Sequence, residues 1–113
     1  MKFRNLVATC LFVIIAAAVS ANAQLNITGS VTGRVVTPGG QSVRRAVVHV
    51  LNLETLESHT RIANDFGYFK FNDLPILNLY MVSVESKAHE FTFGVQLVQF
   101  TALEHNLLFT SDN

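Results

Sequence analysis

From residue 30 onward the sequence consists of brief β-rich runs separated by turn residues about every 8 to 15 positions. No stretch keeps the 3.6-residue apolar period of an amphipathic helix. Short strands at such spacing are typical of antiparallel sandwiches and barrels. We therefore predict an all-β domain, a seven-stranded antiparallel β-sandwich, with a small, partly closed barrel as the alternative. The predicted strands are 30–36, 46–51, 58–63, 68–71, 79–85, 91–98 and 104–109.

Alternation of apolar and polar residues indicates which side chains face the core, because successive residues of a strand point to opposite faces. In residues 79–85 this pattern predicts a buried set, and in 68–71 it places Phe69 and Phe71 on one face. In residues 91–98 it selects a second apolar set for burial. The first set is Tyr80, Val82 and Val84, and the second is Phe91, Phe93, Val95 and Leu97.

Glycine, proline and Asx residues mark the turns. Residues 37–40 predict a type II turn in which Gly39 supplies the positive φ. Residues 64–67 predict a hairpin between strands 58–63 and 68–71, with Gly67 left-handed. Residues 72–75 are predicted to end the fourth strand.

The N-terminus has the three zones of a secretory signal peptide. Lys2 and Arg4 give it a positive start, and an apolar run from Leu6 to Val19 follows. As a helix this run would span about 21 Å, which is short for a membrane anchor of about 20 apolar residues. An A-x-A pattern ends at Ala23, so we predict cleavage between Ala23 and Gln24.

Removal of residues 1–23 would leave a secreted or periplasmic protein without a membrane span. The expected divisions are a signal peptide at 1–23, a lead-in at 24–29, one sandwich domain at 30–110 and a C-terminal tail at 111–113. Cys10 is the only cysteine, so the mature domain would depend on its core rather than on disulfides. It would keep six basic and eight acidic residues, a net charge near −2 that indicates no nucleic-acid partner.

Three stretches share their spacing with a known family. Residues 31–35 place Gly33 within a β run that leads to a Pro/Gly turn, and residues 46–50 form the next strand. The most specific stretch is 64–71, where Asp65 and Gly67 precede an aromatic alternation, followed by Leu74-Pro75 and 80–84. Together they resemble the carboxypeptidase regulatory-like domains, which share a transthyretin-like, or prealbumin-like, sandwich. The resemblance covers about residues 27–91.

The sequence departs from that family in three places. Arg44-Arg45 replaces the usual Pro-Gly before the second strand, Asn78-Leu79 replaces a Gly before the fifth, and His89-Glu90-Phe91 replaces a Gly-aromatic pair. The resemblance implies a non-enzymatic accessory module. With no peptidase or barrel in the sequence, its partner would be an unknown envelope or extracellular protein, or a second copy bound through edge strands.

Candidate ligand sites are few. The four histidines, 49, 59, 89 and 105, lack the short spacing of a metal site, and no cofactor is predicted. Ser30 lies between glycines, but without the spacing of a nucleophile elbow. A loose calcium site would draw on four side chains expected at neighbouring hairpin ends, although turn formation explains them equally well. They are Asn64, Asp65, Asn72 and Asp73.

An enzymatic role is not predicted. Hydroxyisourate hydrolases of the transthyretin-like fold end in Tyr-Arg-Gly-Ser, whereas this sequence ends in Ser111-Asp112-Asn113. The function expected is protein–protein interaction or a structural, accessory role.

The alternative function is carbohydrate binding in the cell envelope or outside the cell, because the family is often grouped with starch-binding-like folds. Phe66 and Tyr68, at a turn, would be the ligand contacts. No tryptophan is present to add a platform for a sugar ring.

Overall fold

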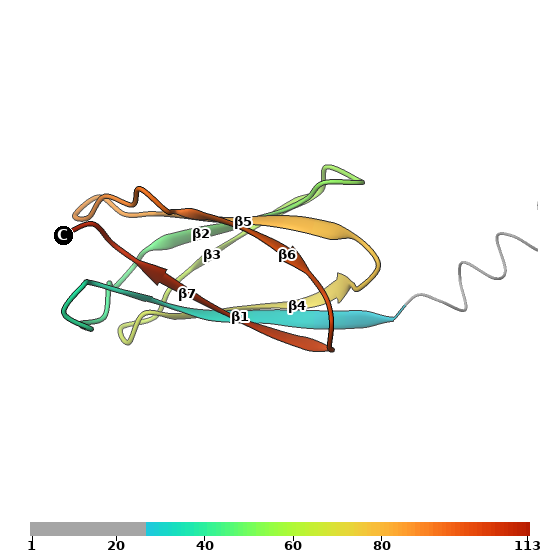
Figure 1. Cartoon of the computed structure of the whole chain (residues 1–113), viewed down its shortest axis with the longest axis horizontal. Coiled ribbons are helices and arrows are strands. Elements are labelled where there is room, and N and C mark those ends of the chain that lie inside the picture. The colour runs from blue at the N-terminus through green and yellow to red at the C-terminus, as the bar shows by residue number, and fades with distance from the viewer. Residues whose placement is uncertain (1–26) are drawn as a thin grey trace, which may run out of the picture.

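The computed structural model describes residues 27–113, which form two stacked sheets (Figure 1). The signal peptide and its cleavage site at Ala23 and Gln24 lie outside the described residues. Within the described part no helix is long and apolar enough to cross a membrane. The strands are β1 (Thr28–Val36), β2 (Val47–Asn52), β3 (Ser58–Ile62), β4 (Tyr68–Pro75), β5 (Leu79–Glu85), β6 (Val95–Gln99) and β7 (Glu104–Thr110).

The strand order is β4-β1-β7 in one sheet and β3-β2-β5-β6 in the other, which confirms the seven-stranded sandwich. One detail of the prediction is wrong: β1 and β7 pair in parallel, while the other four pairs are antiparallel. The cause is the segment after β6, which crosses from the four-stranded sheet to the three-stranded sheet. It brings Leu103 beside the start of β1, where the Leu103 carbonyl accepts a hydrogen bond from Ser30 N at 2.9 Å.

The core lies between the sheets and is built from valines and aromatic rings. Tyr80, Val82 and Val84 are buried in it, as the alternation predicts. Phe69 packs edge-on against Phe71 with ring centroids 6.0 Å apart and lies 6.2 Å from the ring of Phe109. Aromatic pairs in such geometry stabilise a core beyond the area that they bury.

Gly33 in β1 lies opposite Phe69 in β4. A Cβ atom at this position would overlap the Phe69 ring and would lie 2.9 Å from the carbonyl oxygen of Leu107 in β7. The backbone of the central strand is therefore in direct contact with the Phe69 ring. Only glycine fits there without displacing that ring.

The turn at 64–67 forms as predicted, but the hairpin does not. Gly67 is left-handed with φ of 79°, and its N–H donates to the carbonyl of Asn64 at 2.9 Å. β3, however, pairs only with β2, and β4 only with β1. The turn carries the chain from one sheet to the other. Ala63 before the turn and Phe69 after it are both buried in the core, and this burial keeps β3 and β4 apart.

Residues 72–75 do not end β4. The strand continues to Pro75 through a bulge, where Asn72 and Asp73 together oppose Ser30 of β1. Asp73 takes a positive φ of 59°, a conformation that a short Asx side chain tolerates. Asn72 and Asp73, which the sequence predicts as part of a turn, therefore form a bulge within a strand.

The first turn and the double arginine also differ from expectation. Thr37 O accepts a hydrogen bond from Gly40 N at 2.9 Å, and the positive φ, 83°, falls on Gly40 rather than Gly39. Positive φ at the fourth residue is typical of a type I turn, so the predicted type II turn is wrong. Arg45 is left-handed as well, with φ of 57°, a conformation that glycine adopts more readily.

The sixth strand is shorter than predicted, and the opposite face of it is buried. β6 begins at Val95, and residues 91–94 form a turn before it. Val98 is buried, whereas Val95 and Leu97 are exposed. Phe91 is half-buried against the core, while Phe93 is 82% exposed. The predicted burial of the odd-numbered set is therefore wrong for three of its four members.

Residues after β7 are tied to the segment that precedes β6. Asp112 N donates to the carbonyl of Glu90 at 2.8 Å. The Asp112 carboxylate accepts hydrogen bonds from the N–H and the hydroxyl of Thr92, and these bonds lower the pKa of Asp112. The expected C-terminal tail thus joins the end of one sheet to the start of β6.

We predict that Gly33→Ala lowers the free energy of unfolding by about 2 kcal/mol, because overpacking a core typically costs about 1–3 kcal/mol. Gly39→Ala is the matched control, since its Cβ would meet nothing nearer than the Thr37 hydroxyl at 3.9 Å. Thermal and urea unfolding of both variants measure the difference. Equal stability of the two variants would contradict the close contact at Phe69.

Candidate functional site

The predicted ligand contacts lie at the turn between β3 and β4. Phe66 is 67% and Tyr68 is 52% exposed, so both rings are accessible to solvent. Arg34 of β1 connects them: its guanidinium lies 5.2 Å from the Tyr68 ring centroid, and its Nε donates to the Phe66 carbonyl at 3.2 Å. A cation thus occupies one side of the Tyr68 ring.

The four proposed calcium ligands are not brought together. Asn64 and Asp65 precede β4, while Asn72 and Asp73 lie in its distal half, roughly 13 Å farther along the strand. Asn64 Oδ1 instead accepts hydrogen bonds from the N–H groups of Phe66 and Tyr68, each at 3.0 Å. Within residues 27–113 no group of three or more His, Cys, Asp or Glu side chains could hold a metal ion.

The histidines are distributed over the fold and serve local pairs. His49, on the outer face of β2, contacts the Thr60 hydroxyl at 2.9 Å and the Glu85 carboxylate at 3.1 Å. His59 pairs with Glu57 at 3.2 Å. His89 lies 2.7 Å from the carbonyl oxygen of Asn113. Each of these contacts holds a strand or a loop in place.

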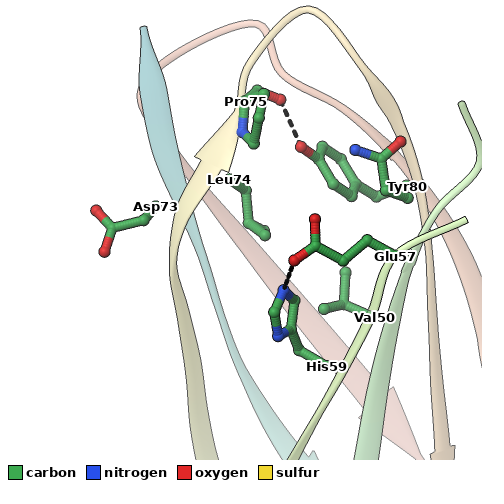
Figure 2. Close-up of a pocket in the computed structure, with 8 residues that line it drawn as sticks. Val50, Glu57, His59, Asp73, Leu74, Pro75 and Tyr80 are labelled. Atoms are coloured by element: carbon green, nitrogen blue, oxygen red, sulfur yellow. Dashed lines mark hydrogen bonds and ion pairs between the residues drawn. The ribbon is translucent and has the colours of Figure 1, made fainter. Parts of the chain in front are cut away.

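A small cavity lies at one end of the sandwich, between the ends of β2, β3, β4 and β5 (Figure 2). The Tyr80 hydroxyl donates to the Pro75 carbonyl at 2.6 Å. Burial, together with the negative charges of Glu54 and Glu57, raises the pKa of Tyr80 from 10.0 to about 12. Figure 2 shows the Asp73 carboxylate directed away from the Glu57–His59 pair.

This cavity has little capacity for chemistry. Its volume is about 60 Å³, well below the roughly 300 Å³ of the smallest typical ligand pockets. Its one buried hydroxyl, on Tyr80, is already used to fix the loop between β4 and β5. The arrangement closes the end of the sandwich with the buried side chains of Leu74 and Tyr80.

Sheet edges are a further candidate surface, because edge strands have unpaired N–H and C=O groups. Three of the four edges carry protection. β3 bears His59 and Arg61, and the Arg61 guanidinium donates to the outward Thr60 carbonyl at 3.1 Å. β4 has Lys70 and the bulge at Asp73. On β7 the Leu108 carbonyl accepts a hydrogen bond from the Gln96 side chain at 2.7 Å.

Among the strands of residues 27–113, β6 is the edge without such protection. Val84 N donates a hydrogen bond to Gly94 O at 2.8 Å. This bond establishes which residues of β6 direct their backbone groups toward β5. Because bonded residues alternate in an antiparallel pair, Gly94, Gln96 and Val98 face β5. The backbone groups of Val95, Leu97 and Gln99 therefore point outward. No charge lies between Glu90 and Glu104.

An apolar surface adjoins this edge on the outer face of the sheet. Strand register aligns Leu51, Met81 and Leu97 in one row across β2, β5 and β6. We call this row and its neighbours the apolar outer patch: Leu51, Leu79, Met81, Val95 and Leu97. Sequence reasoning assigned Val95 and Leu97 to the core, although the long uncharged run around them was a signal for an unprotected edge.

Comparisons with known proteins support the fold. No protein family matches the sequence, and no curated protein matches it either. Among solved structures, the major pilin subunit BcpA of Bacillus cereus matches with a TM-score of 0.63 and 9% identity over 76% of this chain. The TIE protein of Bacillus anthracis matches with a TM-score of 0.62 and 19% identity over 75% of this chain.

A third structure, 5-hydroxyisourate hydrolase of Klebsiella pneumoniae, matches with a TM-score of 0.55 and 16% identity over 73% of this chain. The chain spans 83% of that enzyme but only 30% of the pilin and 16% of the TIE protein. At these identities the likeness is one of fold. The sandwich is related in structure to pilin domains and to transthyretin-like enzymes.

We predict that folded protein retains a Tyr80 pKa near 12, so stability present below pH 10 is lost as the pH rises from 10 to 12. Tyr68→Phe leaves Tyr80 as the sole tyrosine, and ultraviolet absorbance of the phenolate then follows it alone. Tyr80→Phe is the control that should lose this alkaline step in stability. A phenolate step near pH 10 in folded Tyr68→Phe protein would contradict the burial of this hydroxyl.

Proposed function

We propose that the protein is an exported, non-enzymatic β-sandwich module that acts through protein contact at the β6 edge. The observation that carries this proposal is that one sheet edge differs from the other three in its protection against pairing. Among the described strands, β3, β4 and β7 are protected by charge, bulge or side-chain capping, and β6 is left open beside the apolar outer patch. An open edge accepts a partner strand through main-chain hydrogen bonds.

The location outside the cytoplasm rests on two supports. The first is the leader pattern that ends at Ala23. The second is the fold likeness to a major pilin, an ancillary pilin and a pilus adhesin. A structural module on the cell surface or in the periplasm is consistent with both.

Membership of the carboxypeptidase regulatory-like family is part of the same proposal. Gly33 beneath the Phe69 ring and left-handed Gly67 are the family-like positions with a clear structural role. The likeness to a transthyretin-like enzyme supports the same topology. We do not extend that enzyme's activity to this chain, because at 16% identity the likeness is one of fold alone.

Carbohydrate binding at Phe66 and Tyr68 has less support. Sugars stack on open aromatic faces, and Arg34 lies over one face of Tyr68. The exposed Phe66 ring stands without a second ring stacked beside it among the described aromatic pairs. We therefore prefer protein contact as the function.

A photocrosslinking amino acid at position 97, expressed in the exporting cell, tests the contact. Position 62 on β3 is the matched control, because Ile62 is 67% and Leu97 is 64% exposed. We expect protein crosslinks from position 97 and background from position 62. Equal background at both positions would contradict contact at β6.

The same preparation tests export. N-terminal sequencing of protein from the envelope or the medium should begin at Gln24. Protein that keeps Met1 and remains in the cytosol would contradict the proposed location.

A further inference from the structure

A second and larger hollow lies at the end of the sandwich opposite the small cavity. Three connecting segments form it: the loop before β2, the turn before β4 and the segment after β5. Residues 42–45, Asp65, Ala88 and His89 line it. Its volume is about 580 Å³, within the range of about 300–1,000 Å³ that is typical of small-molecule sites. The hollow therefore has room for a ligand larger than a bare ion.

Two arginine side chains of this hollow have no partner in the part of the chain that the structure describes. Arg44 and Arg45 are both exposed, and within residues 27–113 the ion pairs and the arginine hydrogen bonds come from other residues. Asp65 lines the same hollow without forming an ion pair with either of them. A guanidinium group binds a carboxylate or a phosphate through two parallel hydrogen bonds. The hollow thus offers two free guanidinium groups to an oxyanion.

The backbone that carries these arginines is fixed in an unusual conformation. Arg45 has a φ of 57°, in the left-handed region that residues with a Cβ atom rarely adopt. Such residues are held by their surroundings and are concentrated at ligand sites. On one side Val43 is buried, and its N–H donates to the Val35 carbonyl at 2.9 Å. On the other side Ala63 N donates to the Ala46 carbonyl at 2.8 Å.

The other two segments are fixed as well and add polar groups. Asn64 holds the turn that contains Asp65 through its hydrogen bonds to backbone N–H groups. His89 Nδ1 lies 2.7 Å from the Asn113 carbonyl oxygen. Because a carbonyl oxygen only accepts, Nδ1 carries the hydrogen and Nε2 is left for a ligand. A site that is already formed loses little free energy in ordering its groups on binding.

The distribution of charge favours an anion at this hollow. A third guanidinium adjoins it, because Arg34 Nη2 donates to the Ser42 hydroxyl at 3.1 Å. At the opposite end of the sandwich, the charged Lys, Arg, Asp and Glu side chains within residues 27–113 are all acidic. They are Glu54, Glu57, Asp73 and Glu104. An anion is therefore attracted to the hollow and repelled from the opposite end.

We infer that this hollow binds a small ligand that carries a carboxylate or phosphate group. Arg44 and Arg45 bind the anionic group. Asp65 accepts a hydrogen bond from a hydroxyl or ammonium group of the same ligand, and His89 contacts it through Nε2. The site shares no residue with the β6 edge. The inference therefore goes beyond the proposed contact function and does not depend on it.

Titration of the purified protein with three probes tests the inference: glucuronate, glucose as the neutral match without the carboxylate, and inorganic phosphate. At least one of the two anions should bind with a dissociation constant of about 1 mM or tighter, and glucose should not bind. Amide signals in the NMR spectrum should shift at residues 42–45, 65 and 88–89. A response to glucuronate alone assigns a carboxylate ligand, and a response to phosphate alone assigns a phosphate ligand. No saturable response to either anion, or an equal response to glucose, overturns the inference.

Two variants test the arginines, and a third is their control. Arg45→Gly removes the guanidinium, but glycine adopts the positive φ more readily, so the melting temperature should stay the same or rise. The dissociation constant of the anion should increase at least about ten-fold in this variant and in Arg44→Gln. Lys70→Gln removes one positive charge from an exposed position on β4 outside the hollow and should leave the affinity unchanged. Unchanged affinity in both arginine variants, or an equal loss in Lys70→Gln, overturns the assignment to this hollow.

Discussion

The contact between Gly33 and the ring of Phe69 fixes the arrangement of the whole sandwich. β1 is the central strand of its sheet, with β4 on one side and β7 on the other. The missing side chain at Gly33 lets the Phe69 ring lie over the strand, where it also packs with Phe71 and Phe109. These three rings come from the two strands that flank β1. The absence of a side chain at Gly33 therefore leaves the space in which the Phe69 ring lies over the central strand of its sheet.

The sequence predicts the existence of all seven strands and the buried face of β5, because regular alternation and turn residues act locally. It also predicts the left-handed Gly67. The pairing of β3 and β4 could not be predicted in this way. A well-formed turn fits both a hairpin and a crossing between sheets, and the choice depends on β1, which pairs with β4, and on β2, which pairs with β3.

The alternation of apolar and polar residues could not predict which face of β6 is buried, for a different reason. Both of its faces carry large apolar residues, Leu97 outside and Val98 inside, so apolar character alone does not distinguish them. The hydrogen bond between Val84 N and Gly94 O sets the pairing of β6 with β5, and this pairing decides which side chains of β6 point into the core. The candidate surface at β6 was hidden in the sequence because its residues resemble core residues. An open binding surface and a core share the same composition, and only their position in the fold separates them.

The parallel pairing of β1 with β7 has a mechanical consequence. The first and last strands of the described chain are neighbours, and in Figure 1 β1 begins at one end of the sandwich while the chain after β7 ends at the other. Tension applied between these two points would act along the strands and load the evenly spaced hydrogen bonds of the pair in shear. The bonds would then resist together instead of opening one after another. A sandwich with this pairing would therefore resist a pulling force applied between these two points.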